Sequence, residues 1–211
     1  MNERAAAALV ILSLLGCGRS EAVAAKSDEA PANTKRSEPS IEAARQFVLS
    51  SDPNEPIVRV TYGRSALLGL PAPTYTLYGD GRLEVAKSDT RQDPKAPPPA
   101  PESVVVDADE LHALGELAAN PLLIEGNREA LATEFDRAGS LMRDGSVVTV
   151  DVRLASYSRA GVALGPVART FKMVDPQLAA QHQLGGEAVQ ALAALVNGIT
   201  RLYYDTKEEA Q

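Results

Sequence analysis

Alternation of apolar and polar side chains with a period of two is the feature that most constrains how this chain can fold. It is clearest from Ser146 to Leu154, where Val148, Val150, Val152 and Leu154 alternate with a mostly polar set of neighbours. Because successive side chains of a strand point to opposite faces of a sheet, this pattern predicts a strand with one buried face. Its predicted partner runs from Ala168 to Val174, with Phe171 and Met173 facing inward.

The same alternation predicts three strands nearer the N-terminus, at 57–62, 74–78 and 82–86. The last two are separated by Gly79, Asp80 and Gly81, with Tyr78 and Arg82 on either side. An Asp-Gly pair between alternating segments is a strong hairpin signal, because these residues accept the positive φ that a primed turn requires. We therefore expect a hairpin at 78–82 with a primed turn.

Helices are predicted by capping residues and by apolar residues at spacings of three and four. Asp107 and Glu110 form a capping box that opens a helix, and Asn120-Pro121 ends it. Two further helices are predicted at 127–135 and at about 186–204.

The order of these elements is three strands, a helix or two, two more strands and a closing helix. It predicts an α+β fold: a small antiparallel β-sheet of about five strands with two or three helices packed on one face. We expect a single α+β globular domain at 56–205, of roughly 150 residues, which is an ordinary domain size. A disordered tail is expected at 206–211.

The N-terminal segment has a different character. Residues Ala5 to Leu15 are apolar apart from Ser13. Such a run is too short for a membrane span of about 20 residues, but it is typical of the core of a signal peptide. It ends near Cys17, the one cysteine of the chain, so no disulfide can form within the protein.

Residues Leu14, Leu15, Gly16 and Cys17 resemble the lipobox of bacterial lipoproteins. The resemblance implies a signal peptide at 1–16, cleavage before Cys17, and diacylglycerol on the Cys17 sulfur. Two or three acyl chains make a stable membrane anchor. Gly18, in place of Asp, implies delivery to the outer membrane, facing the periplasm.

Residues 17–55 are expected to form a disordered tether between this anchor and the domain. From Gly18 to about Ser40 the chain is rich in Ala, Ser, Glu, Lys and Pro, and it has too few large apolar residues to offset the entropy cost of ordering. One or two amphipathic helical turns are predicted at Ile41–Leu49.

The segment Tyr-Gly-Asp-Gly-Arg at 78–82, preceded by Pro-Ile-Val-Arg-Val at 56–60, is similar to a hairpin of a family of uncharacterised bacterial lipoproteins. In that family a strand, this hairpin, a helix and a second hairpin occur in the same order. The resemblance covers roughly Pro56 to Val174, although this chain has Ala72-Pro73 where some related domains have Cys-Pro. It implies a cell-envelope location and a fold, but no activity.

The charge of the chain argues against nucleic acid as a partner. The formal net charge is −7, and the predicted domain lacks the Lys/Arg cluster that releases counterions from phosphate. Anionic lipid headgroups repel the same negative charge, so attachment to a membrane is expected to come from the lipid on Cys17.

No residue pattern predicts a catalytic site, a cofactor or a metal. His112 and His182 lie outside any catalytic motif, and Ser65, Ser156 and Ser158 lie outside a Gly-x-Ser-x-Gly elbow. The aspartates next to glycines are typical of turns, and two distant histidines are too few for a zinc site.

The sequence therefore favours a lipid-anchored cell-envelope protein whose domain is a non-enzymatic binding or interaction module for an envelope protein or another envelope component. A first alternative is a periplasmic inhibitor or accessory factor of an envelope enzyme. Such a factor inserts an exposed loop, for which the candidates are Ala66–Pro73 and the proline-rich segment Lys87–Pro101. A second alternative is a hydrolase with an unrecognised site.

Overall fold

The structure of the protein is a computed structural model that describes residues 45–63, 72–87, 100–142 and 145–209. Its strands are β1 (Arg45–Val48), β2 (Pro56–Tyr62), β3 (Thr74–Tyr78), β4 (Arg82–Ala86), β5 (Glu102–Val105), β6 (Val147–Arg159) and β7 (Val162–Val174). Its helices are α1 (Ala108–Ala118), α2 (Pro121–Ile124), α3 (Arg128–Gly139), α4 (Pro176–Gln181) and α5 (Glu187–Glu209).

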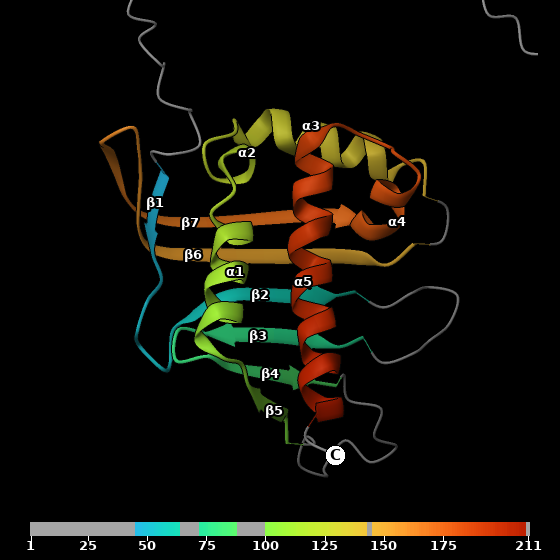
Figure 1. Ribbon diagram of the computed structural model, residues 1–211. Coiled ribbons are helices and arrows are strands. Elements are labelled where there is room, and N and C mark those ends of the chain that lie inside the picture. The colour runs from blue at the N-terminus through green and yellow to red at the C-terminus, as the bar shows by residue number, and fades with distance from the viewer. Residues whose placement is uncertain (1–44, 64–71, 88–99, 143–144, 210–211) are drawn as a thin grey trace, which may run out of the picture. The chain divides into compact units, whose positions relative to one another are not determined.

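The strands form one antiparallel sheet in which β6 is the strand with most partners. On one side β6 pairs with β7, and on the other side it pairs with β2 and β1, which lie end to end. The order then continues through β3, β4 and β5, so that β7 and β5 are the edge strands (Figure 1). The α+β fold is confirmed, but the described residues form seven strands and five helices, more than the sequence predicts.

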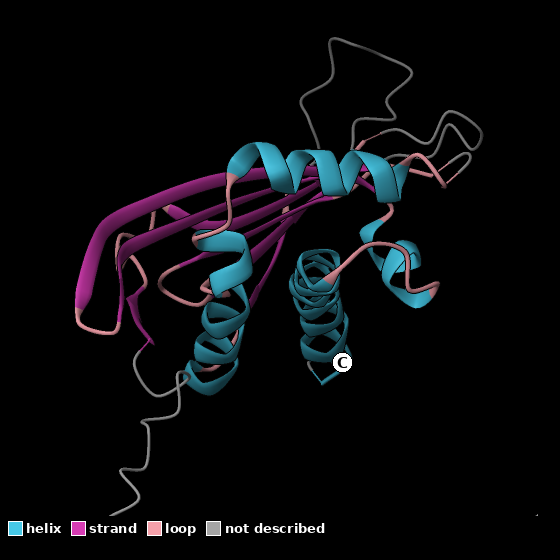
Figure 2. Ribbon diagram, turned by 90° about the horizontal axis from the view of Figure 1, so that it is seen from above, coloured by secondary structure: helices cyan, strands magenta, loops and turns pink. Residues whose placement is uncertain are grey.

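The helices form a second layer against one face of the sheet. Figure 1 shows α5 crossing in front of the strands, and Figure 2 shows α1 and α5 on the same side, with α3 running beside the β7 edge. Among the described residues, no helix covers the opposite face of the sheet (Figure 2).

The core lies between these two layers. The apolar residues predicted to recur along the last helix are all buried: Val189, Leu192, Val196, Ile199 and Tyr203. From the sheet, the buried set includes Val150, Val152 and Leu154 of β6 and Phe171 and Met173 of β7. The period-two and helical patterns of the sequence therefore identify both sides of the core correctly.

Side-chain caps explain where two of the helices begin. The Asp107 carboxylate accepts a hydrogen bond from the N–H of Glu110 at 2.8 Å, as the capping box predicts. The Asn127 side chain accepts hydrogen bonds from the N–H groups of Glu129 and Ala130 and so starts α3. The predicted helix at 127–135 is thus confirmed, and it continues to Gly139.

The prediction of helical turns at Ile41–Leu49 is wrong for the part that the structure describes. Arg45–Val48 is strand β1, and residues 41–44 lie outside the described residues. β6 extends beyond the end of β2, and β1 pairs with this outer part of β6, where Phe47 lies opposite Tyr157. A long-range strand pairing therefore overrides the local apolar spacing.

The hairpin between β3 and β4 is present, but the prediction of a primed turn is wrong. The N–H of Gly81 donates to the carbonyl of Tyr78 at 3.1 Å, and of the three turn residues Gly81 alone has a positive φ, 85°. This is a three-residue turn with glycine in the left-handed position. The turn with positive φ at two successive residues lies instead at Ala160 and Gly161, with φ of 50° and 78°, between β6 and β7.

Candidate functional site

The uncovered face of the sheet is our candidate functional surface. It is built by alternate residues of β7, β6, β2, β3 and β4, together with Ser103 of the edge strand β5. One row of cross-strand partners consists of Thr170, Asp151, Arg59, Thr76, Glu84 and Ser103. The neighbouring row consists of Lys172, Thr149, Thr61, Thr74 and Ala86. A polar outer face is what an antiparallel sheet with one solvated side is expected to show. We call this set of residues, together with Arg153, the open face.

Thr76 is buried in the middle of the open face. It is 7% exposed, and it lies between Arg59 and Glu84 in the strand register. Among the described residues its hydroxyl has no hydrogen-bond partner, whereas the Thr170 hydroxyl donates to Asp151 at 2.6 Å. A buried hydroxyl without a partner is costly, so this position favours an additional polar group at the surface, such as water or a bound partner.

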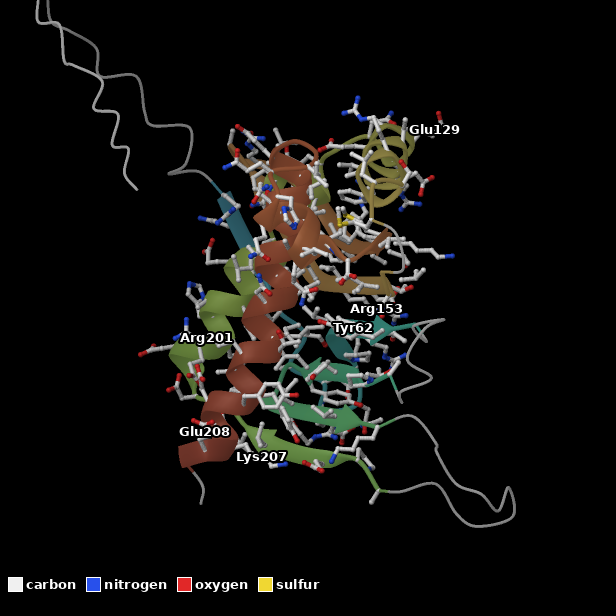
Figure 3. All side chains as sticks on the ribbon, turned by 90° about the vertical axis from the view of Figure 1, so that its right-hand side faces the viewer. Tyr62, Glu129, Arg153, Arg201, Lys207 and Glu208 are labelled. Carbon is white, nitrogen blue, oxygen red and sulfur yellow. The ribbon has the colours of Figure 1, made fainter. Side chains whose placement is uncertain are left out.

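Three cations of the open face form no ion pair among the described residues. Arg59, Arg153 and Lys172 are exposed, and within the described ranges none has a carboxylate at ion-pair distance. Figure 3 shows Arg153 on the sheet side of the molecule and Arg201 on the helix side. The open face carries these three cations and two carboxylates, Asp151 and Glu84, so it has a small positive excess although the chain has a net charge of −7.

Arg82, in contrast, is fully engaged by its own hairpin and by a neighbouring loop. Its guanidinium carbon lies 3.9 Å from the centre of the Tyr78 ring, and the guanidinium forms an ion pair with Glu84. It also donates to the carbonyl of Pro53 at 2.6 Å. The conspicuous residues at 78–82 therefore hold the hairpin against the loop between β1 and β2.

At Gly79 the backbone of the hairpin lies close against the backbone of Ser50. A Cβ at Gly79 would lie 1.4 Å from the carbonyl oxygen of Ser50, so only glycine fits without a shift of backbone. The hairpin predicted from Tyr78, Gly79, Asp80, Gly81 and Arg82 is thus a packing element of the fold.

Two networks of titratable groups lie at the ends of the sheet. Tyr157 of β6 donates to Glu125 at 2.6 Å, and Arg159 donates to the other oxygen at 2.7 Å. Burial and the hydrogen bond to Glu125 raise the pKa of Tyr157 to about 12. Burial tends to raise the pKa of Glu125, but these two hydrogen bonds outweigh it, and the net shift is downward.

The second network joins β5 to the end of α5. Glu102 accepts hydrogen bonds from Lys207, Lys87 and Tyr203, which lower its pKa to about 2. Figure 3 shows Lys207 at the end of α5. Both networks pair every carboxylate with donors, which is the arrangement of structural ion pairs.

The two histidines lie on separate helical segments. His112 is on α1, where its ring stacks on Phe47 with centroids 5.5 Å apart, and its Nε2 lies 3.7 Å from Glu116. His182 is exposed at the end of α4. Ser156 and Ser158 pair with β1. Neither histidine is hydrogen-bonded to a serine among the described residues.

Several predicted residues lie outside the described residues. These are Leu14, Leu15, Gly16 and Cys17 of the lipobox, Gly18, Ser65, most of the two loops considered as inhibitory wedges, and residues 210–211 of the tail expected at 206–211. Residues 206–209 of that tail belong to helix α5, so the expectation of disorder is wrong for them.

Within the part of the chain that the structure covers, no group of three or more potential metal ligands occurs. Among the described helices, none combines the length and the apolar character needed to cross a membrane.

The open face was not identified from the sequence, although its signal is present there. The alternation in β2 and β6 already places Arg59 and Arg153 opposite the buried valines. Their proximity depends on the pairing of β2 with β6, which brings Arg59 opposite Asp151. Strand order is a long-range property that the pattern does not contain.

Comparison of the chain with protein-family models finds no match, and no curated protein matches it significantly.

Proposed function

We propose that this protein is a lipid-anchored envelope lipoprotein whose domain is a non-enzymatic interaction module, docking an acidic protein surface on the open face. The observation that carries the proposal is the uncovered face of the sheet, where Arg59, Arg153 and Lys172 have no carboxylate at ion-pair distance among the described residues. The lipobox resemblance supports the anchor on Cys17, and Gly18 supports the outer membrane facing the periplasm. The hairpin resemblance to uncharacterised lipoproteins agrees with both.

Charge complementarity selects the partner. Basic residues on a protein with a net charge of −7 attract an acidic surface and repel a second copy of the same face. The flat, hydrogen-bonding threonines of the open face suit a protein surface better than a small molecule, which needs a concave site. The partner is therefore an envelope protein with an acidic patch.

The anchor is tested by feeding cells a fatty acid that carries a chemical label. The wild-type chain is expected to incorporate the label, and Cys17→Ala is expected to incorporate none. Equal labelling of both chains, or no labelling of either, rejects the anchor.

The docking surface is tested by photo-crosslinking in the native envelope. A benzoylphenylalanine at Thr149, on the open face, is expected to capture one acidic protein, whereas the same residue at Ala194, exposed on α5, is expected not to capture it. Combined Arg59→Glu and Arg153→Glu should reduce the captured yield several-fold, since like charges then oppose each other. Arg201→Glu is the matched control on the helix side. If Arg201→Glu reduces the captured yield as much as the double substitution, or if the partner is captured only from Ala194, the open face is not the docking surface.

A further inference from the structure

A groove runs between α3 and the edge strand β7. Its volume is about 450 Å³, within the range of roughly 300 to 1,000 Å³ that is typical of small-molecule sites. Five consecutive residues of β7, at 168–172, line it. Because strand side chains alternate between the two faces of a sheet, a groove lined by consecutive residues lies along the edge of the strand.

Backbone groups of β7 face this groove. The N–H of Asp175 donates to Ser146 at 3.0 Å, which shows that odd-numbered residues in this part of the strand bond toward β6. In an antiparallel pair the even-numbered residues then direct their N–H and C=O groups outward. One of these outward groups is the carbonyl of Ala168, which accepts a hydrogen bond from Arg128 at 3.4 Å. The outward N–H of Thr170 is a donor available to a bound molecule.

The floor of the groove is apolar and well ordered by packing. Leu131, Phe135 and Phe171 line it and are buried. The two phenylalanine rings pack edge to face, with centroids 6.1 Å apart. Such a floor favours the apolar part of a ligand.

One end of the groove carries two guanidinium groups. Arg169 donates to the carbonyl of Ile124, and Arg128 donates to Ala168, so both groups are held in place by backbone oxygens. Neither has a carboxylate at ion-pair distance in the part of the chain that the structure describes. Burial, and next the charge of Arg128, lower the pKa of Arg169. The repulsion between the two cations is thus not relieved within the described residues.

The acidic residue of the groove lies away from this pair. Asp136 follows Arg128 by eight residues on α3, which corresponds to roughly 12 Å along the helix axis. The groove therefore has a cationic end, an apolar middle and a mixed end formed by Asp136 and Lys172.

We propose that this groove binds a small organic oxyanion, with its carboxylate or phosphate held by Arg128 and Arg169 and its apolar body lying on Phe135 and Phe171. Guanidinium groups bind both oxyanions through paired, charge-assisted hydrogen bonds. The groove shares Thr170 and Lys172 with the open face. Its anion-binding arginines, Arg128 and Arg169, are distinct from Arg59 and Arg153 of the proposed protein docking, so either proposal can fail without the other.

The test is titration calorimetry of the full chain in mild detergent with naphthoate, naphthyl phosphate and the neutral naphthylmethanol. Both anions are expected to bind, and the neutral alcohol is expected to bind at least ten-fold more weakly, since it cannot replace a charge-assisted hydrogen bond. A preference between the two anions distinguishes a carboxylate from a phosphate as the natural group.

Arg128→Gln is expected to weaken both anions roughly ten-fold or more, and Arg128→Lys to have an intermediate effect, because lysine keeps the charge and loses the paired geometry. The matched control is Arg137→Gln, an exposed arginine of the same helix that does not line the groove. Thermal unfolding of each variant shows that it is folded. The proposal is overturned if neither anion binds, if the neutral alcohol binds as tightly, or if Arg137→Gln weakens binding as much as Arg128→Gln.

Discussion

Glu102 is a carboxylate whose ionisation is strongly altered by the fold. Lys207, Lys87 and Tyr203 donate to its carboxylate and lower its pKa from 4.5 to about 2. A lowered pKa in the folded state contributes stability above the ordinary pKa, and this stability is lost as the pH falls through the folded value. We therefore expect the free energy of unfolding to decrease between about pH 4.5 and about pH 2 in part through Glu102.

Glu102→Gln removes this contribution. Urea denaturation across the acid range should show the variant less stable than the wild type near neutral pH, with the difference shrinking as the pH falls toward about 2. Two curves that stay parallel throughout that range contradict the prediction.

At alkaline pH, we expect the stability of the protein to depend in part on Tyr157. Because its pKa is raised to about 12, Tyr157 contributes to the free energy of unfolding at pH values below about 10, and this contribution is lost as the pH rises toward about 12. Tyr157→Phe leaves Glu125 without one donor, and we expect it to cost about 1.5 kcal/mol or more in the free energy of unfolding at neutral pH. In an ultraviolet titration of tyrosinate, the variant should lack one late-titrating group. If the variant instead loses its amplitude near the ordinary tyrosine pKa of about 10, the result argues against the network.

At the scale of single elements, the turn between β6 and β7 stores strain. Ala160 has a φ of 50°, in the left-handed region, where an ordinary residue costs roughly 1 to 2 kcal/mol. Asn tolerates this region better, so Ala160→Asn should raise the free energy of unfolding by about 1 kcal/mol.

Ala160→Gly serves as the comparison. Glycine relieves the same strain but gains more freedom in the unfolded chain, so its net gain should be smaller. Urea denaturation midpoints are expected in the order Asn, Gly, Ala from most to least stable. If the wild-type protein, with Ala160, is at least as stable as the Ala160→Asn variant, the turn is not strained at this position.

At the scale of the whole domain, distant segments meet where the β3–β4 hairpin lies against the loop between β1 and β2. A Cβ at Gly79 would lie 1.4 Å from the Ser50 backbone oxygen. Gly79→Ala should therefore displace one segment from the other and cost roughly 1 to 3 kcal/mol, which denaturation would reveal. Asp80→Ala changes the same turn at an exposed position and is expected to cost less. If the two variants lose equal stability, the close contact is not the cause.

Much of the architecture could be predicted because its signals are local. Each of these signals lies within the element that it predicts. They are the alternation from Ser146 to Leu154, the apolar spacing of α5 and the cap of α1 at Asp107. β1 and β5 were missed because each has four residues, too few for a clear period, and each is stabilised by its partner strand.

The sequence by itself determined the α+β class and the buried side of each long element, since these depend on neighbouring residues along the chain, whereas the lipobox at Cys17 stays a prediction. Only the tertiary structure decided that Arg59 and Arg153 share the open face, and that Arg128 and Arg169 meet at the end of the α3–β7 groove. The reason is physical: the period of a strand determines which way its side chains point, but the entropy and packing of the whole chain determine which strands and helices become neighbours.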